Sequence, residues 1–217
     1  MKTDFIDAVK AGDAERVEEL LARDAALAAA RDENGVSALM LAYYYGARDS
    51  VGAIIRDRVP ELDAFEAATV GDVERLRELL DADPGLATAR SSDNGTALHF
   101  ASFFGQPAAA RLLIERGSDV HAVSPSFGNV MPLHSAAAAP SVEIVRLLLD
   151  AGADPSARQS GGFTPLQAAA QHGDAEMARA LLEHGADPAA ASDDGRTALS
   201  IAEEKGHDDV AALLRPA

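Results

Sequence analysis

The sequence predicts an all-α protein in which helix–turn–helix units stack side by side as a solenoid. Two observations lead to this fold class. First, the chain of 217 residues repeats itself with a period of about 33 residues, which is the length of one helix–turn–helix repeat. Second, 47% of the residues are apolar, but only 5% are aromatic and none is Trp. We therefore expect a core of closely spaced helices that carry Ala and Leu.

The internal repeat is most regular in the C-terminal half of the chain. A shift of 33 residues places residues 164–188 on 197–214, and a second shift of 33 reaches 131–155. A shift of 35 residues then reaches 96–120. Nearer the N-terminus the period is 59, which we interpret as one repeat of 33 or 34 residues and one shortened to about 25.

The sixth repeat shows how the residues of one unit specify two helices. Thr164 can cap the first helix and Pro165 can begin it, because the first helical position needs no N–H donor. Gly173 suits a left-handed helix end. Asp174 can then cap a second helix, which Gly185 ends. The apolar stripe of that second helix consists of Met177, Ala180, Leu181 and Leu182. Two helices of this size cannot bury their apolar faces alone, so the units must stack.

Two signatures recur in register along the chain. The first is a tetrapeptide at the start of a unit's first helix: Thr96-Ala97-Leu98-His99, Met131-Pro132-Leu133-His134, Thr164-Pro165-Leu166-Gln167 and Thr197-Ala198-Leu199-Ser200. The second is a turn, Gly152-Ala153-Asp154 and Gly185-Ala186-Asp187. With these signatures essentially the whole chain resembles the ankyrin repeat family. The resemblance implies an all-α ankyrin repeat solenoid of about seven helix–turn–helix units with short, hairpin-like finger loops.

The whole chain, 1–217, is expected to form a single domain. Its units are approximately 1–31, 32–56, 57–90, 91–125, 126–158, 159–191 and 192–217. The first and last units are expected to be caps, with polar Asp4, Asp7 and Lys10 in the first and Glu203, Glu204 and Lys205 in the last. The segment from Arg56 to Asp63 is too short for a finger, so we expect one finger to be missing and a gap to lie there. Pro140 replaces the Gly between the helices of the fifth unit and predicts a departure from the standard turn.

Charge and composition exclude several classes of partner. The chain carries 35 acidic and 19 basic residues, a net charge of −16. Duplex nucleic acid and anionic membranes would be repelled. The negative surface serves solubility, or alternatively attracts a protein with a basic surface. With no Cys, the chain forms no disulfide or thiolate site. It has neither a membrane-spanning apolar run nor a secretory signal, so a cytoplasmic location is expected. The excess of Arg over Lys is typical of a GC-rich bacterial genome.

The motifs of common enzymes are missing from the sequence. It contains no P-loop, no GxGxxG and no HExxH, so we expect no enzyme, no cofactor and no metal site. Equivalent side chains of stacked helices lie about 8–10 Å apart, too far for ligands about 2 Å from one metal ion. His99 and His134 fall on the repeated tetrapeptide. There the ankyrin resemblance implies an imidazole that bonds neighbouring backbone.

Half of the ten aromatic residues lie at two places, Tyr43 to Tyr45 and Phe103 to Phe104. Each place comes directly before the Gly that ends a first helix. The core-facing stripes are Leu39, Ala42 and Tyr43, matched by Leu98, Ala101 and Ser102. Successive helical residues are about 100° apart, so Tyr44 and Phe103 are predicted to point away from the core. Tyr45 and Phe104 flank them.

The resemblance implies that residues before this Gly line a concave groove in which partners bind. The third unit offers small residues there, and two further Phe lie at predicted finger tips over the groove. The expected partner-binding residues are Tyr44, Tyr45, Thr69, Val70, Phe103, Phe104, Phe127, Phe163, Gln171 and His172. In the alternative interpretation, the aromatic residues fill space between repeats beside the missing finger.

We therefore expect a non-catalytic protein–protein interaction module that holds a protein or peptide in its groove, as a scaffold, inhibitor or regulator. Exposed aromatic clusters mark recognition sites, and Tyr and Phe give large contact area at little entropic cost. The partner is expected to present a basic surface or one that accepts aromatic side chains. The alternative is a sensor of a small molecule or peptide ligand that uses the gap beside Tyr43–Tyr45 as a pocket.

Overall fold

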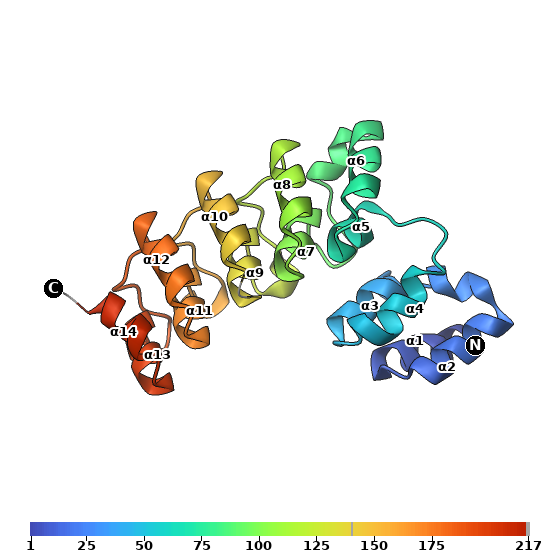
Figure 1. Cartoon of the computed structure of the whole chain (residues 1–217), viewed down its shortest axis with the longest axis horizontal. Coiled ribbons are helices and arrows are strands. Elements are labelled where there is room, and N and C mark those ends of the chain that lie inside the picture. Colours follow the sequence, from blue (N-terminus) through green and yellow to red (C-terminus); the bar gives the residue numbers. More distant parts are fainter. Residues whose placement is uncertain (140, 216–217) are drawn as a thin grey trace.

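The computed structural model describes residues 1–139 and 141–215, so the turn at Pro140 lies outside the described residues. In the described part of the chain the helices form pairs that follow one another along a solenoid (Figure 1). The first helices of the pairs are α1 (Lys2–Ala11), α3 (Ala38–Tyr44), α5 (Ala64–Val70), α7 (Ala97–Phe103), α9 (Pro132–Ala138), α11 (Pro165–His172) and α13 (Ala198–Lys205). The second helices are α2 (Ala14–Arg23), α4 (Ala53–Arg56), α6 (Val73–Ala82), α8 (Pro107–Glu115), α10 (Val142–Asp150), α12 (Ala175–Glu183) and α14 (Asp208–Leu214). The all-α repeat solenoid predicted from the sequence is confirmed.

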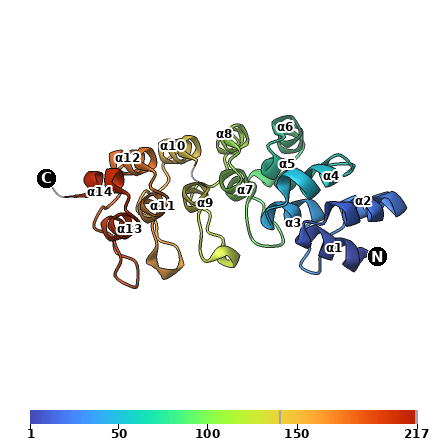
Figure 2. The same cartoon turned by 60° about the horizontal axis from the view of Figure 1, so that its bottom comes forward.

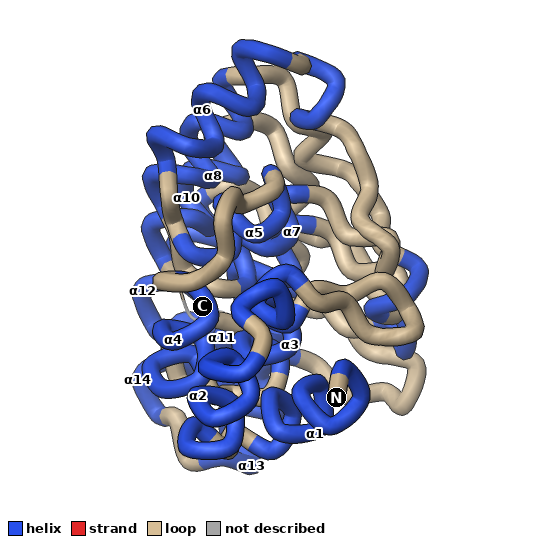
Figure 3. Tube along the Cα trace, turned by 90° about the vertical axis from the view of Figure 1, so that its right-hand side faces the viewer, coloured by secondary structure: helices blue, strands red, loops and turns tan. Residues whose placement is uncertain are grey.

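Short helical turns occupy the connections: η1 (Ala25–Ala29), η2 (Arg48–Gly52), η3 (Pro84–Ala87), η4 (Pro125–Phe127) and η5 (Ser160–Gly162). Figure 2 shows the second helices α6 to α12 in one row and the first helices α7 to α13 in the row beside them, with the loops projecting beyond the first helices. Viewed from the N-terminal end, these loops gather along one edge of the molecule (Figure 3).

The core lies between the two rows of helices. The largest fully buried side chains are Phe5, Leu20, Leu39, Ile55, Leu76, Leu80, Leu98, Leu113, Leu133, Ile144, Leu148 and Leu166. Many of the remaining core residues are Ala, including Ala67, Ala101, Ala136 and Ala169. Small side chains at these positions let neighbouring helices approach closely. The expected core of Ala and Leu is therefore confirmed.

In three units the repeated tetrapeptide joins the unit to the next finger. Nδ1 of His99 accepts the N–H of Thr96 (3.2 Å), and its Nε2 donates to the Val130 carbonyl in the following finger (3.1 Å). His134 and Gln167 make the corresponding bonds to the carbonyls of Ala157 (3.0 Å) and Arg196 (2.6 Å). Burial lowers the pKa of both histidines, which keeps them neutral. The structural role expected for His99 and His134 is confirmed.

One connection along the solenoid is short. The connections before α3, α7, α11 and α13 span 14 residues each and the one before α9 spans 16, whereas α4 and α5 are joined by the seven residues 57–63. The longer connections carry finger loops, several closed by an antiparallel bridge such as Arg31 with Ser37. The missing finger is therefore a property of the fold. In Figure 1 the helices α1 to α4 are set apart from the row that begins at α5.

The loops on either side of the missing finger close up on each other. Consecutive fingers elsewhere touch through their tips, where the Ser160 N–H donates to the Gly128 carbonyl (2.8 Å). Across the missing finger, a Cβ placed on Gly35 would lie 3.3 Å from the Ser92 Cβ, so the loops before α3 and α7 are direct neighbours. The expected gap is thereby reduced to a cleft of about 270 Å³ between them.

Candidate functional site

Seven aromatic rings meet where α3, α5, α7 and the loop before α9 come together. Each ring centroid lies within 6.5 Å of another. This aromatic cluster consists of Tyr43, Tyr44, Phe65, Phe100, Phe103, Phe104 and Phe127. Its members come from three different first helices, and the cluster therefore spans the joint at which the finger is missing.

Tyr44 lies at the centre of the cluster. Its ring stacks on Phe104 (6.0 Å between centroids) and meets Phe100 (6.4 Å) and Phe127 (6.5 Å). Its hydroxyl donates to the Asp93 carboxylate (2.5 Å), in the loop before α7. Burial, reinforced by the bond to Asp93, raises the pKa of Tyr44, so the phenol stays protonated and remains a donor. These contacts fasten α3 to α7 across the joint.

The prediction that Tyr44 points freely into the groove is therefore wrong in part. Tyr43, Tyr44 and Phe104 are each half-buried, and Tyr43 meets the edge of Phe104 at 5.2 Å. For these three residues the alternative interpretation holds, because they fill the space beside the missing finger. The short 57–63 connection brings α3 close enough to α7 for this contact, which the repeat pattern alone does not reveal.

Three aromatic residues keep large exposed surfaces. Tyr45 is 58% exposed, Phe103 is 48% exposed and Phe127 is 40% exposed. Phe103 rests its edge on Phe104 (5.1 Å) and points outward from the end of α7. Phe127 lies in η4 of the neighbouring loop and packs against Phe100 (6.4 Å). These three side chains match the predicted exposed aromatic positions.

An apolar cleft of about 310 Å³ lies between α7, α9 and their loops. Its lining residues are Tyr44, His99, Phe100, Phe103, Phe127, Val130, His134, Ser135, Ala138 and Gln159. Phe103 and Ala138 occupy the same position of consecutive first helices, each the last helical residue. The small side chain of Ala138 leaves open the space beside the Phe103 ring. We call this space the aromatic cleft.

The two histidines of the aromatic cleft are already engaged in hydrogen bonds. Both ring nitrogens of His99 bond to backbone, and Nε2 of His134 donates to a backbone carbonyl. The lining includes no Lys, Arg, Asp or Glu among the described residues. The cleft therefore offers apolar contact and shape rather than a free base or nucleophile.

Thr69 and Val70 do not lie on the surface, and this is a correction. Eight residues separate the cap from the following Gly in α3 and α7, but only seven separate Asp63 from Gly71 in α5. A residue of α5 that is counted back from Gly71 therefore lies one position, or about 100° around the helix, away from its counterpart in α3 and α7. Thr69 is fully buried, with its hydroxyl on Met40 Sδ (3.0 Å), and Val70 is 8% exposed.

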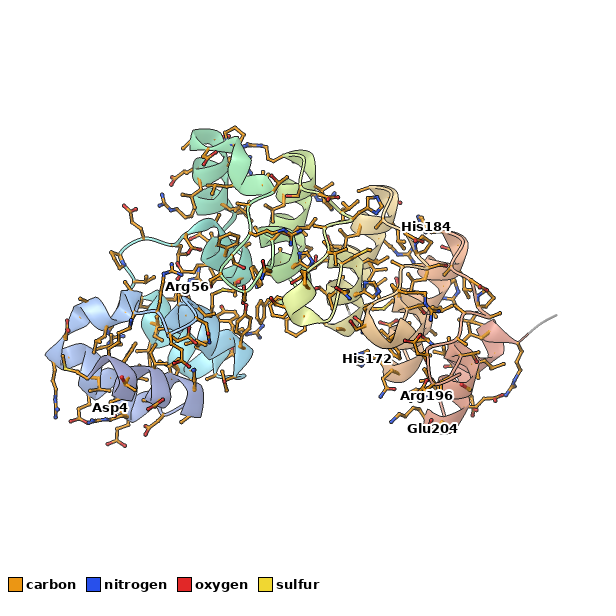
Figure 4. All side chains as sticks on the ribbon, turned by 180° about the vertical axis from the view of Figure 1, so that it is seen from behind. Asp4, Arg56, His172, His184, Arg196 and Glu204 are labelled. Carbon is orange, nitrogen blue, oxygen red and sulfur yellow. The ribbon has the colours of Figure 1, made fainter. Side chains whose placement is uncertain are left out.

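The remaining expected residues lie away from the aromatic cleft. Phe163 is half-buried and packs against the core directly before the cap Thr164, so it is not at a finger tip. Gln171 and His172 are exposed at the end of α11. Figure 4 shows His172 on the same side of the solenoid as Glu204, toward the C-terminus.

A second, open cleft of about 520 Å³ lies beside Tyr43, near the Arg56 label in Figure 4. Its lining residues are Tyr43, Arg48, Asp49, Ala53, Arg56, Asp57, Val70 and Gln106. Half of them are charged, in contrast to the aromatic cleft. Tyr44 and Tyr45 do not line it, so the pocket expected next to Tyr43–Tyr45 is only partly formed by those residues.

Within 1–139 and 141–215, no three His, Asp or Glu side chains are placed to share a metal ion. No helix in the same residues combines the length and the apolar character needed to cross a bilayer.

Comparison with known proteins identifies the repeats. Residues 64–159 and 133–217 match the family described as ankyrin repeats (three copies). A 95-residue segment is 40% identical to the rice protein "Probable E3 ubiquitin-protein ligase XBOS31", covering 43% of this chain and 21% of that protein. Segments also match rat "Ankyrin repeat and SAM domain-containing protein 6" (34% identity, 47% of this chain, 11% of that protein) and fruit fly "Palmitoyltransferase Hip14" (33% identity, 46% and 15%). The matches thus span about a tenth to a fifth of these relatives' own lengths.

Proposed function

Because this chain belongs to the ankyrin repeat family, whose repeats are in general protein–protein interaction modules, we propose that it binds a protein or peptide partner and performs no catalysis itself. The partner lies against the first helices and their loops, with its main contact at the aromatic cleft. One observation carries this proposal: Phe103 and Phe127 expose 48% and 40% of their surfaces on the walls of an apolar cleft.

The energetics of exposed aromatic rings support the proposal. An apolar patch in water costs solubility and marks a contact surface more often than chance. Aromatic side chains bury a large area for little lost side-chain entropy, and they dominate the binding energy of interfaces. Phe103 also rests on Phe104, so its ring is held in place before a partner arrives. Such preorganisation lowers the entropic cost of binding.

A non-catalytic role agrees with the chemistry of the cleft. His99 has both ring nitrogens in backbone hydrogen bonds, and burial lowers the pKa of His99 and of His134. Neither is placed to exchange protons with a ligand. The ligase and transferase names belong to relatives of which the matched segments cover only 21% and 15%.

The acidic balance bears on the type of partner. With 35 acidic and 19 basic residues, the surface favours a basic protein over nucleic acid, whose phosphates it would repel. The alternative of a small-ligand sensor has less support, because the 520 Å³ cleft beside Tyr43 is open and charged. The aromatic cleft, at about 310 Å³, is at the low end for small-molecule sites, which run from about 300 to 1,000 Å³.

Affinity capture from the native host tests the proposal. Immobilised wild-type protein should retain a stoichiometric protein, and Phe103→Ala should reduce the retained amount at least about tenfold. Glu115→Ala is the matched control, because Glu115 is exposed at the end of α8 in the same unit but on the row of second helices. It should retain the partner as wild type does. If Phe103→Ala and Phe127→Ala both retained as much partner as wild type does, the partner would bind elsewhere. If a metabolite co-purified without any protein, the alternative of a small-ligand sensor would be favoured.

A further inference from the structure

We propose that the segment bound at the aromatic cleft carries a bulky apolar side chain next to a Lys or Arg. The apolar side chain enters the cleft, and the cation pairs with Asp93. This inference rests on the proposed function, because it specifies the chemistry of the partner at the same surface. Three features support it: the shape of the cleft, the position of Asp93, and the hydrogen bonds in which the neighbouring arginines are already engaged.

The cleft accepts one side chain rather than a flat surface. Its walls are the rings of Phe100, Phe103 and Phe127, and its open side exists because Ala138 stands where α7 has Phe103. About 310 Å³ of space with no charged lining matches an aromatic or long aliphatic group. Burying such a side chain removes a large apolar surface from water, which suits the anchor of an extended segment.

Asp93 lies beside the aromatic cleft without lining it, and it lines the neighbouring cleft of about 270 Å³ together with Arg31 and Arg90. Tyr44 both lines the cleft and donates its hydroxyl to Asp93 (2.5 Å). The other side-chain donor to Asp93 is the hydroxyl of Ser91. Both donors are neutral, and no ion pair to Asp93 occurs among the described residues. Its charge is therefore available to a cation of the partner, and that cation would also lie near the Tyr44 ring, where cation–π attraction adds to the ion pair.

The arginines of the loops do not supply that cation. Arg90, the nearest in sequence, donates to the carbonyls of Asn94 (2.9 Å) and Val123 (2.8 Å) and so joins two loops. Arg31 and Arg158 have corresponding bonds, to the carbonyls of Gly35 (3.1 Å) and Ala191 (2.8 Å). Arg31 and Arg158 also form ion pairs, with Asp63 (2.8 Å) and Asp193 (3.1 Å), so all three guanidinium groups are already engaged. With a net charge of −16 over the whole chain, an acidic segment would be repelled and a basic one attracted.

A display library of short random peptides tests the inference without knowledge of the natural partner. Selection against wild-type protein should enrich peptides with an aromatic or long aliphatic residue close to Lys or Arg. One enriched peptide is then synthesised with a fluorophore, together with a version in which Gln replaces the basic residue. Fluorescence anisotropy gives the Kd of both peptides for each variant, and the affinity of the basic peptide should fall as the salt concentration rises.

Two variants examine the two halves of the proposal. Ala138→Leu fills the cleft from an exposed helix end and should raise the Kd of the selected peptide at least about tenfold. Ala108→Leu, at an exposed position of α8, is its control and should leave the Kd unchanged. Asp93→Asn keeps an acceptor for the Tyr44 hydroxyl but removes the charge. It should raise the Kd of the basic peptide several-fold and the Kd of the Gln version very little. Thermal melts check that each variant is folded.

The outcomes separate this inference from the proposed function. Acidic or purely polar consensus peptides, an unchanged Kd in Ala138→Leu, or an equal effect of Asp93→Asn on both peptides would each overturn the inference. If such peptides still depended on Phe103, the proposed function would stand and only the chemistry of the partner would be wrong. If no peptide were enriched, the inference would fail, while capture of a protein through Phe103 would test the proposed function independently.

Discussion

Side chains at equivalent repeat positions have different environments in this protein. Tyr44 and Phe103 are both the last residue of a first helix, yet Tyr44 is half-buried under Phe104 and bonded to Asp93, while Phe103 is 48% exposed. The difference arises at the joint, where the short connection brings α3 against α7. An exposed residue and a packing residue are thus distinguished by their neighbours, not by their register.

Substitution by Ala should reveal this difference as a difference in stability. Phe103→Ala removes exposed surface and should change the free energy of unfolding by roughly 0.5 kcal/mol or less. Tyr44→Ala removes three ring contacts and a hydrogen bond and should cost on the order of 1–3 kcal/mol. Leu98→Ala empties a fully buried site and should cost roughly 2–5 kcal/mol. Urea denaturation measures all three, and equal costs for Phe103→Ala and Leu98→Ala would show that Phe103 is packing.

At the scale of elements, the three first helices α7, α9 and α11 each have one bridging side chain. His99, His134 and Gln167 bond the cap of their own helix and a carbonyl of the next loop. The bridge replaces hydrogen bonds that a helix start and a loop would otherwise lack. The chain uses a titratable imidazole in two units and a neutral amide in a third, and this variation provides an internal control.

Stability should therefore depend on pH through the two histidines. Burial lowers the pKa of His99 and of His134, so below about pH 6.5 the unfolded chain binds more protons than the folded one. The contribution to stability is complete above that pH and is lost as the pH falls. Denaturation midpoints should drop between about pH 7.5 and 5.5. The double variant His99→Gln, His134→Gln, which copies the bridge of Gln167, should show a much smaller drop; an equal drop would assign the effect to other groups.

At the scale of the whole molecule, stability is a sum over units and their interfaces. Since each pair of helices buries its apolar face against its neighbours, we propose that residues 1–217 form one domain with a polar unit at each end. The last pair, α13 and α14, places exposed Glu203, Glu204 and Lys205 at the end of its first helix. Its inner face covers α11 and α12, where Met177 and Leu181 are fully buried.

Removal of residues 192–217 should expose that apolar flank. We expect aggregation or a clear fall in Tm, because Met177 and Leu181 would lose the unit that covers them. Light scattering and a thermal melt measure both effects. A monodisperse product with an unchanged melt would show that the last unit contributes no interface energy.

The sequence by itself determined the repeats, the helices and their caps. These depend on short-range rules: Thr164 caps α11, Gly173 ends it in the left-handed conformation, and Asp174 caps α12. The positions of the exposed Phe103 and Phe127 also followed from the repeat register. Each of these features needs only the residues within one unit, so a repeated pattern is enough to predict it.

Only the tertiary structure decided which aromatic residues pack and which remain free. Tyr44 bonds Asp93, which is 49 positions away, and this contact exists because a missing finger lets non-consecutive loops meet. The burial of Thr69 follows from the spacing between Asp63 and Gly71, which is one residue shorter than in the units of α3 and α7. The aromatic cleft follows from Ala138 standing beside Phe103. Such features depend on the angle between units and on pairs of side chains from different units. The repeat pattern specifies neither, because it describes each unit alone.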